Sequence, residues 1–330
     1  MCRRNARGLP KGASMRALIC GVGGQDGAYL ARLLLKQGYE VIGTSRDAMT
    51  ATFSSLDRLG IRHSLATVSM AINDFRSILS VLEKYSPDEV YNLAGQSSVG
   101  LSFEQPVETM DSITGGTLNL LEAIRFTHRP IRFYNAGSGE CFGDTGDCRA
   151  TEETPFHPRS PYAVAKASSH WLVRNYRESY GIFACTGILF NHESPLRPER
   201  FVTQKIVRAA ARIASGNKER LTLGNINIQR DWGWAPDYVE AMWKMMCQDC
   251  ADDYVIATGQ TKSLEYFIDC AFKHFALNWK DHVDTDISLL RPSEISVGQA
   301  DPSKAFKKLG WQSTTTIDQV IANMSSEVYA

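Results

Sequence analysis

Short apolar runs and amphipathic stretches alternate along the first 180 residues of the chain. The apolar runs at 16–20, 40–44, 89–94 and 131–136 have the length of buried strands, whereas 28–37, 77–84 and 117–126 space their apolar side chains as helices do. Strands that alternate with helices of this length are joined by right-handed crossovers. The pattern therefore predicts an α/β fold on a doubly wound parallel sheet, open at the carboxyl ends of its strands.

The second half of the chain keeps this rhythm less regularly. It predicts strands at 181–190, 221–225 and 254–258, and helices at 201–215, 238–250 and 316–324. No repeat, low-complexity tract or linker divides the chain, so we expect two lobes built onto each other. The predicted parts are a disordered extension at 1–14, a larger domain at 15–180, and a smaller C-terminal lobe at 181–330 that returns some segments to the first sheet.

Composition narrows the class of protein. The chain has 330 residues, of which 43% are hydrophobic and 22% charged, as in an ordinary globular protein. Its 36 basic and 36 acidic residues give a formal charge of zero, so no overall field attracts nucleic acid or an anionic membrane. No apolar stretch reaches the roughly 18 residues that span a bilayer, and the first residues do not resemble a secretory signal. We therefore predict a cytoplasmic protein without nucleic-acid or membrane partners.

The eight cysteines do not form the framework of a small disulfide-rich protein in a chain of this length. Cys247 and Cys250 form a C-x-x-C pair in the helical stretch, but no second Cys or His pair stands at zinc-finger spacing. We interpret these two residues as buried thiols and predict no metal site.

Glycines gather directly after the first predicted strand, in Gly21-Val-Gly-Gly-Gln-Asp-Gly27. Glycines at 21, 24 and 27 suit a tight turn, a close backbone approach to a pyrophosphate, and close packing of helix on strand. The helix that begins here offers free N–H groups and a partial positive charge to phosphates. The larger domain is therefore predicted to be an NAD(P)-binding domain of the Rossmann type.

The residues after the second strand bear on the choice of dinucleotide. At this position, about 20 residues beyond the glycines, an acidic side chain suits a ribose 2′-hydroxyl and an arginine suits a 2′-phosphate. The sequence offers Ser45, Arg46 and Asp47. Arg46 can pair with a phosphate and Ser45 can donate a hydroxyl, whereas Asp47 favours NAD. We favour NADP as the cofactor and keep NAD as the alternative.

Four residues form the strongest chemical pattern, Ser138, Glu140, Tyr162 and Lys166. Ser138 follows the strand predicted at 131–136, at the edge where an open sheet places its site. Tyr162 and Lys166 stand four residues apart, on one face of a helix. An ammonium group near a phenol stabilises the phenolate, so we expect Lys166 to lower the pKa of Tyr162 toward the range in which it removes a proton from an alcohol.

Several further segments occur together in one known family. They are Gly24-Gln-Asp-Gly-Ala-Tyr-Leu30, Tyr91-Asn-Leu-Ala94, Gln96-Ser97, Ser160-Pro-Tyr162, Gly187-Ile-Leu-Phe-Asn-His-Glu-Ser-Pro195, Arg230-Asp-Trp-Gly233 and Arg291-Pro-Ser-Glu294. With these segments the chain, from about Met15 to Trp311, resembles the extended short-chain dehydrogenase/reductases that act on nucleotide sugars, and among them the GDP-mannose 4,6-dehydratase family. The Asn-His-Glu-Ser and Arg-Asp-Trp-Gly segments are specific to the dehydratases.

The resemblance assigns roles to residues. It implies that Ser138, Glu140, Tyr162 and Lys166 are catalytic. For the cofactor it implies Gly21, Gly24, Gln25, Asp26, Gly27, Arg46, Leu93, Ala94, Tyr162 and Lys166. For the substrate it implies Ser97, Asn191, Val202, Lys205, Leu223, Arg230, Arg291 and Glu294, with Arg197 a further candidate. Guanidinium groups and a carboxylate suit a diphosphate and a guanine ring, so the chemistry of these residues agrees with a GDP-sugar.

The resemblance also implies a reaction, the loss of water from GDP-D-mannose to give GDP-4-keto-6-deoxy-D-mannose. Tyr162 would remove the O4 proton while the C4 hydride passes to the nicotinamide. Glu140 would remove the C5 proton and assist departure of the C6 hydroxyl, after which the hydride returns to C6. Because the nicotinamide ends as it began, we expect tight retention of the dinucleotide.

Three alternatives remain open at this point. The GDP-4-keto-6-deoxymannose reductases share the fold and the four catalytic positions. A dehydratase of another GDP-sugar, such as a GDP-heptose, would need the same ring chemistry. A cofactor-binding regulator that has lost turnover is the non-enzymatic alternative.

The chain departs from the family pattern at four places. Gly137-Ser-Gly-Glu140 has two glycines, which we expect to loosen the backbone that aims Glu140. Arg46-Asp47 and the loop at 48–56 lack the family's further basic residues, and in relatives that loop reaches a neighbouring subunit's cofactor. Ser69-Met70-Ala71 lacks an expected adenine-contacting Asp, and Gly95 and Ser98 flank the Gln of the pocket wall. We expect a homodimer or a homotetramer.

Overall fold

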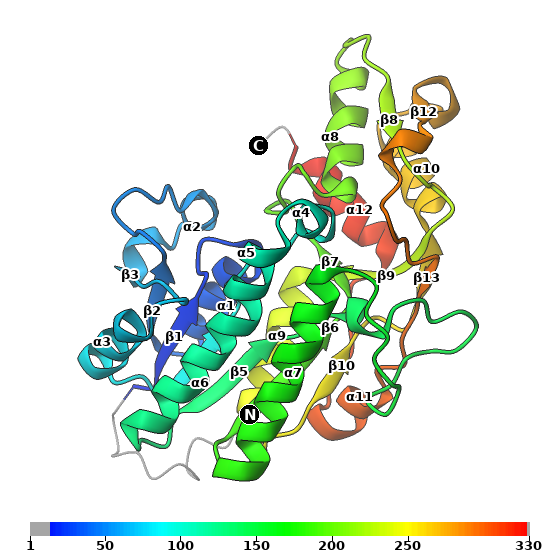
Figure 1. Ribbon diagram of the computed structural model, residues 1–330. Coiled ribbons are helices and arrows are strands. Elements are labelled where there is room, and N and C mark those ends of the chain that lie inside the picture. The colour runs from blue at the N-terminus through cyan, green and yellow to red at the C-terminus, as the bar shows by residue number, and fades with distance from the viewer. Residues whose placement is uncertain (1–13, 329–330) are drawn as a thin grey trace.

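The computed structural model describes residues 14–328, so the extension predicted at 1–14 falls, except for Ser14, outside the described residues. A parallel sheet of seven strands forms the centre of the protein (Figure 1). In spatial order its strands are β10 (Tyr254–Ile256), β6 (Ala184–Leu189), β5 (Arg132–Ala136), β4 (Glu89–Asn92), β1 (Arg16–Cys20), β2 (Glu40–Ser45) and β3 (Ala66–Ser69). This order confirms the predicted α/β fold with a doubly wound sheet.

The central strands are buried because helices cover both faces of the sheet. In β1 the four residues from Ala17 to Cys20 are fully buried, as expected for a parallel strand between two layers of helices. One face is covered by α3 (Phe75–Tyr85), α6 (Gly116–Thr127) and α7 (Pro161–Tyr180) (Figure 1). The other is covered by α1 (Gln25–Lys36) and α9 (Ala235–Met246).

The predicted strands and helices of the first half match observed elements, but some observed elements give no sequence signal. β3 is a four-residue strand whose side chains are half-buried or exposed, so it has no apolar run. Between β4 and α6 lie α4 (Val99–Glu104), α5 (Pro106–Met110) and a π-helical turn (Asp111–Gly115). These are too short to display a helical period in the sequence.

The start of α7 is fixed by its local sequence. Ser160 is the N-cap, and its Oγ accepts a hydrogen bond from the Ala163 N–H at 3.1 Å. Pro161 occupies the first turn, where its missing N–H costs nothing. The helix ends at Gly181, whose φ of 65° is a left-handed conformation that glycine adopts without strain. Tyr162 therefore stands in the first turn of a well-defined helix.

The second lobe has a hydrophobic core of its own. It contains α8 (Val202–Ala214), α10 (Leu264–His274) and α12 (Ile317–Ser326), which extend upward from the main sheet in Figure 1. One small sheet pairs β8 (Leu221–Leu223) with β12 (Val283–Thr285). Another joins β9 (Gln229–Trp234) to β7 (Asn191–Glu193), β11 (Thr261–Ser263) and β13 (Val297–Gly298). β6 and β10, from the second half of the chain, belong to the main sheet.

Short elements complete the described chain. They are α2 (Ser54–Arg58), α11 (Ser303–Leu309) and 3₁₀ turns at Arg62–Ser64, Gly139–Phe142, Trp279–Asp281 and Ile287–Leu289. Cys250 is exposed, so the interpretation of the C-x-x-C pair as two buried thiols is wrong. α9 ends at Met246, and Cys250 lies beyond the helix on the surface. Among residues 14–328 no helix is long and apolar enough to cross a membrane, and the cytoplasmic location stays a prediction.

Candidate active site

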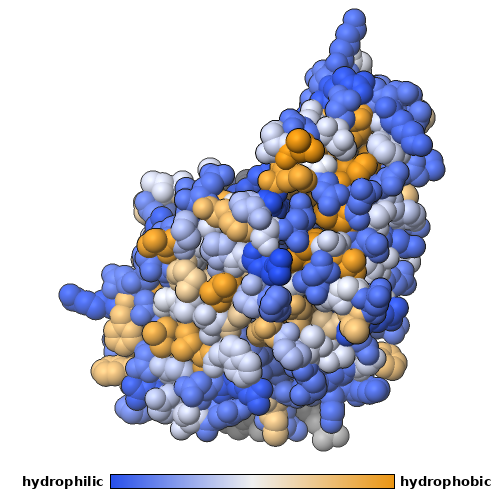
Figure 2. Space-filling model, turned by 45° about the vertical axis from the view of Figure 1, so that its right-hand side comes forward, coloured by the Kyte–Doolittle hydropathy of each residue, from blue (hydrophilic) through white to orange (hydrophobic). Residues whose placement is uncertain are grey.

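A cavity of about 450 Å³ opens at the carboxyl ends of the central strands. The sheet side of its wall comes from residues that follow β1, β4, β5 and β6. The second lobe supplies the other side, through the start of α8, the end of β8 and strand β9. Figure 2 shows hydrophobic side chains in the recess between the main body and the projecting lobe, amid a largely hydrophilic surface.

Most of the predicted site residues line this cavity. All four candidate catalytic residues do so: Ser138, Glu140, Tyr162 and Lys166. All candidate substrate residues do so as well: Ser97, Asn191, Val202, Lys205, Leu223, Arg230, Arg291 and Glu294, together with Arg197. Of the candidate cofactor residues, the lining includes Asp26, Leu93, Ala94, Tyr162 and Lys166, and leaves out Gly21, Gly24, Gln25, Gly27 and Arg46.

The glycine segment forms a cradle of bare backbone beside Asp26. Gly21 has a φ of 82°, and a Cβ on Gly27 would lie 2.4 Å from the Gly21 carbonyl oxygen, so α1 packs directly against the turn. Gly24 is the N-cap of α1, and no side chain of the described residues caps the helix there. Within the described part of the chain the N–H groups at this helix start are free, and the glycines leave room beside them. Such an arrangement fits the pyrophosphate of a dinucleotide.

Ser138 and Glu140 lie in a tightly bonded turn at the end of β5. The Glu140 N–H donates to Ser138 Oγ at 3.2 Å. The Gly137 N–H donates to the Gly187 carbonyl oxygen on β6 at 2.8 Å, which extends the sheet pairing by one residue. These bonds hold the backbone of the turn that carries Glu140.

The two glycines around Ser138 permit close packing. A Cβ on Gly137 would lie 2.7 Å from Thr186 Cγ2, and a Cβ on Gly139 would lie 2.9 Å from ring atoms of Phe190. Neither position has space for a larger residue unless its neighbours move. Close packing accounts for glycine at both positions, and the looser backbone at Glu140 stays a prediction.

Lys166 ties α7 to the end of β5. Its Nζ donates to the Ala136 carbonyl oxygen at 2.7 Å and lies 5.8 Å from the centre of the Tyr162 ring. Burial lowers the pKa of Lys166 to about 8, because the ammonium group loses hydration in the cavity wall.

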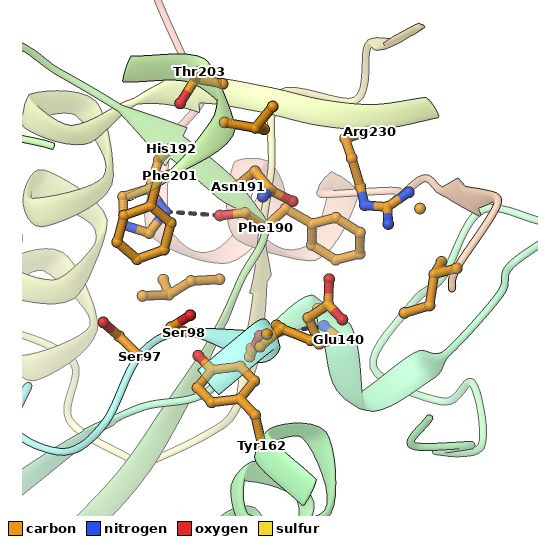
Figure 3. Close-up of a pocket in the computed structure, with 18 of the residues that line it drawn as sticks. Ser97, Ser98, Glu140, Tyr162, Phe190, Asn191, His192, Phe201, Thr203 and Arg230 are labelled. Carbon is orange, nitrogen blue, oxygen red and sulfur yellow. Dashed lines mark hydrogen bonds between the residues drawn. The ribbon is translucent and has the colours of Figure 1, made fainter. Parts of the chain in front are cut away.

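The phenol of Tyr162 is protonated in the surroundings that the protein provides. Burial raises the pKa of Tyr162 above its ordinary value, and a hydrogen bond with Ser138 acts in the opposite direction without overcoming it. The expectation that Lys166 lowers this pKa is wrong for the protein groups alone, since the ammonium is directed to the Ala136 carbonyl. Figure 3 shows Tyr162 and Glu140 pointing into the same space, so a phenol and a carboxylate face one bound molecule.

The second lobe presents positive charge and an open helix start to the cavity. Arg230 is only 5% exposed and donates to the Gln229 carbonyl oxygen at 2.9 Å; burial lowers its pKa. Lys205 Nζ donates to the Thr222 carbonyl oxygen at 2.9 Å. α8 begins after Phe201, and within the described residues no side chain caps it. A buried guanidinium and free helical N–H groups suit a diphosphate.

Three ionisable residues of the cavity wall, His192, Glu193 and Arg200, are absent from the sequence-based site. His192 Nε2 lies 2.9 Å from Asp26 Oδ2, and Glu193 Oε2 lies 3.3 Å from Arg197 Nε. His192 and Glu193 follow the strand predicted at 181–190 and therefore stand at the carboxyl edge where an open sheet has its site. Their place directly after that strand was the sequence signal that could have identified them as site residues.

Arg46 follows the end of β2 and extends into solvent. Its side chain is 79% exposed, and Nη2 lies 3.3 Å from Glu108 Oε1. Asp47 Oδ1 accepts the Met49 N–H at 2.9 Å, and this contact holds the pKa of Asp47 below its ordinary value. The carboxylate is therefore used by its own turn, while the guanidinium makes only a surface contact.

Comparison with known proteins identifies close relatives in sequence. A family model described as GDP-mannose 4,6 dehydratase matches residues 18–324 of the chain. GDP-mannose 4,6 dehydratase 1 of Arabidopsis thaliana is 46% identical over 321 residues, which cover 94% of this chain and 89% of the relative. GDP-mannose 4,6-dehydratase of Vibrio cholerae is 42% identical over 346 residues, which cover 94% of this chain and 93% of the relative. These matches confirm the resemblance found in the sequence.

Solved structures share the fold over almost the whole chain. dTDP-glucose 4,6-dehydratase from Streptomyces venezuelae, with NAD and TYD bound, has a TM-score of 0.85 at 21% identity and covers 94% of this chain and 96% of its own. UDP-glucose 4-epimerase from Thermus thermophilus, in complex with NAD, has a TM-score of 0.83 at 23% identity, with coverages of 96% and 99%. RMD from Pseudomonas aeruginosa, complexed with NADPH, has a TM-score of 0.79 at 23% identity, with coverages of 96% and 99%. At these identities the likeness concerns the fold alone.

The lowered pKa of Lys166 predicts a stability difference that depends on pH. The folded value is about 8 and the unfolded value about 10.4, so between them the unfolded chain holds one proton more than the folded chain. Stability therefore rises with pH across this window, and we expect wild type to gain free energy of unfolding relative to Lys166→Met. Urea unfolding at several pH values measures this difference, with the exposed Lys280→Met as control. A constant difference between wild type and Lys166→Met would contradict the assigned burial.

Proposed function

The chain belongs to the GDP-mannose 4,6-dehydratase family, and on this basis we propose that it converts GDP-D-mannose to GDP-4-keto-6-deoxy-D-mannose with loss of water. The observation that carries the proposal is the convergence of the Tyr162 phenol and the Glu140 carboxylate on one cavity. The first group serves proton transfer at O4 of the sugar, and the second serves proton transfer at the neighbouring C5. Alcohol oxidation alone would require only the first.

Tyr162 is proposed to remove the O4 proton, with Ser138 hydrogen-bonded to the same phenol. Lys166, fixed 2.7 Å from the Ala136 carbonyl oxygen, keeps a positive charge near the ring. A bound, oxidised nicotinamide dinucleotide would supply hydride acceptance at C4 and hydride return at C6, and its positive charge would favour the phenolate. The protein groups alone favour the neutral phenol, so deprotonation is tied to the loaded enzyme.

Glu140 is proposed to act next, on the keto sugar. A ketone at C4 acidifies the C5–H bond, and the Glu140 carboxylate takes that proton. Glu140 then delivers the proton to the C6 oxygen, which leaves as water and creates a C5–C6 double bond. Tyr162 finally returns its proton to C5. The backbone of the turn that carries Glu140 is bonded to Ser138 Oγ and, through Gly137, to β6, which supports this role of the carboxylate.

The second lobe is proposed to bind the nucleotide part of the substrate. Arg230 and the N–H groups at the start of α8 would take the diphosphate. Arg291 and Glu294, on the segment after β12, would contact the guanine, whose edge carries both acceptors and donors. Asn191 would hydrogen-bond the sugar between them.

A nicotinamide dinucleotide is the cofactor that the fold and the glycine cradle support, because relatives in fold are described with NAD or NADPH. We propose NADP over NAD. Arg46 has only a surface contact to give up, and the Asp47 carboxylate is engaged with the Met49 N–H. The acidic side chain that would select NAD is thus occupied, and the guanidinium remains for a 2′-phosphate.

We further propose that two copies of the chain pair through α6 and α7. These helices lie side by side over one face of the sheet (Figure 1). α6 exposes Leu118 and Phe126, and α7 exposes Val164, Trp171 and Tyr180. Exposed apolar side chains on two neighbouring helices favour a buried interface, and a twofold axis would place the same helices against each other.

Product analysis tests the proposed function. Purified protein with GDP-mannose and no added reductant is expected to form the 4-keto-6-deoxy product without net formation or consumption of NADPH. Stoichiometric NADPH consumption on the keto sugar would instead make the protein a reductase. Turnover of a GDP-heptose but not of GDP-mannose would change the substrate, and binding of dinucleotide without any turnover would favour a regulator.

Glu140→Gln is expected to lower the rate of water loss by about 10²-fold or more, because the amide cannot accept the C5 proton. GDP-mannose binding, measured by calorimetry, should change far less. Glu153→Gln, on an exposed residue outside the cavity lining, is the matched control. Turnover of Glu140→Gln at the wild-type rate would show that another group removes the C5 proton.

Arg46→Ala is expected to weaken NADPH binding by about tenfold or more, because one charge-assisted phosphate contact is lost. NADH binding should be unchanged, since it lacks the 2′-phosphate. Arg220→Ala, which removes another exposed arginine paired with an acid, controls for loss of surface charge. Equal effects on both dinucleotides would rule out Arg46 as the selecting residue.

Trp171→Glu is expected to shift the protein from dimer to monomer in light scattering, because a charge would be buried in the interface. The side chain of Trp171 is 54% exposed in the single chain, and that of Phe306 on α11 is 57% exposed. Phe306→Glu should therefore leave the mass unchanged. A monomeric wild type, or a dimeric Trp171→Glu, would overturn this interface.

A further inference from the structure

His192 lies between the glycine cradle and the sugar side of the cavity, and the proposed reaction gives it no task. Its Nδ1 is 2.7 Å from the Phe190 carbonyl oxygen, and its Nε2 is 2.9 Å from Asp26 Oδ2. Figure 3 draws the first of these bonds as a dashed line. His192 is 8% exposed, and its ring stacks on Tyr238 at 4.5 Å between ring centres.

The partners of His192 determine its protonation. A peptide carbonyl oxygen accepts hydrogen bonds and never donates them, and an ionised carboxylate does the same. With Asp26 ionised, both ring nitrogens act as donors, which makes the ring an imidazolium. Burial opposes this charge, but Asp26 outweighs it and raises the pKa of His192. Burial likewise opposes the Asp26 carboxylate, yet His192 keeps the pKa of Asp26 below its ordinary value.

Gln25 adds a second set of contacts across the same junction. Its Nε2 donates to Asp26 Oδ1 at 3.0 Å and to the His192 carbonyl oxygen at 3.1 Å. Its Oε1 accepts from Ser194 Oγ at 2.7 Å. The first turn of α1 is thus bonded both to the ring of His192 and to the backbone of β7, whose first residue is Asn191.

We propose that His192 is a positioning residue that, as an imidazolium, clamps the Asn191 segment to the first turn of α1 through Asp26. The clamp joins the cavity wall that faces the sugar to the helix start that faces the dinucleotide. Binding of one ligand, which orders its own site, therefore favours binding of the other. Its part in sugar binding rests on the proposed function. Its protonation and its bonding do not.

Two other ionisable groups face the ring. Arg197, which follows β7, repels the imidazolium and forms its own ion pair with Glu193. Tyr238, on α9, stacks on the ring and is fully buried. Neither accepts a proton from the imidazole nitrogens in this geometry, so Asp26 is the residue whose removal should change the charge of His192.

The protonation of His192 can be measured without any turnover. In full-length protein with ¹⁵N-labelled histidine, loaded with NADPH, both ring nitrogens of His192 are expected to give imidazolium signals at neutral pH. His192→Phe assigns the signals by their loss. In Asp26→Asn the signals should become those of a neutral ring, with Nδ1 still protonated toward Phe190. A neutral His192 in wild type would overturn the proposal.

The coupling between the two sites can be measured by calorimetry. NADPH cannot accept hydride, so GDP-mannose and NADPH form a complex without reaction. We expect NADPH to tighten GDP-mannose binding about fivefold or more in wild type. In His192→Phe, which keeps the stacked ring and loses both hydrogen bonds, this factor should fall to about one. Asp26→Asn should retain part of it, because an amide can still bond to a neutral imidazole.

His170→Phe is the matched control, because His170 is also buried between aromatic rings but does not line the cavity. It should keep the wild-type coupling. Wild-type coupling in His192→Phe would overturn the proposal, as would equal loss of coupling in His170→Phe. If wild type binds NADPH but no GDP-mannose, the proposed function fails, and the ¹⁵N signals still decide whether His192 is the charged clamp.

Discussion

The hydrogen bond from Lys166 Nζ to the Ala136 carbonyl oxygen joins the two elements that hold the reacting groups. Tyr162 stands on the first turn of α7, and Glu140 stands on the turn after β5, so nothing local in the sequence brings them together. The bond ends on Ala136, the last residue of β5, and so links the start of α7 to that strand end. Both the phenol and the carboxylate line the same cavity.

Burial in the cavity wall disfavours the charged forms of several groups that the proposed reaction uses. Burial lowers the pKa of Lys166 and of Arg230 and raises that of Tyr162, so each charged form is disfavoured in the protein alone. A diphosphate beside Arg230 and a positive nicotinamide beside Tyr162 would each restore the missing favourable interaction. We therefore expect the reaction to proceed only when both ligands are bound. The clamp proposed for His192 would connect the two binding sites and so favour binding of both ligands together.

The main sheet was predictable because its inner strands are buried on both faces and appear as apolar runs, as β1 does from Ala17 to Cys20. The edge that holds the site followed from the topology, since Ser138 and Asn191 come directly after such runs. Strands of two or three residues, such as β13, have no period to detect. Contacts over long separations, such as Asp26 with His192 across 166 positions, arise only from tertiary packing.

Local sequence is also a poor guide where burial or close packing decides the outcome. The pair Tyr162 and Lys166 favours a lowered phenol pKa by charge alone, yet desolvation dominates in the folded protein. The Phe190 ring against Gly139 makes glycine a packing requirement there, which the residue type does not reveal. Both effects arise from the surroundings of a residue, which neither its identity nor its spacing shows.

We propose that one sugar ring meets both the phenol and the carboxylate, so that hydrogen moves within the sugar while C5 exchanges its proton. GDP-mannose labelled with deuterium at C4, incubated with the protein in ordinary water, tests this directly by mass spectrometry and NMR of the product. We expect a 4-keto sugar with the label at C6 and, in heavy water, one solvent deuterium at C5. Loss of the C4 label to solvent, or a product that keeps its C6 hydroxyl, would contradict it.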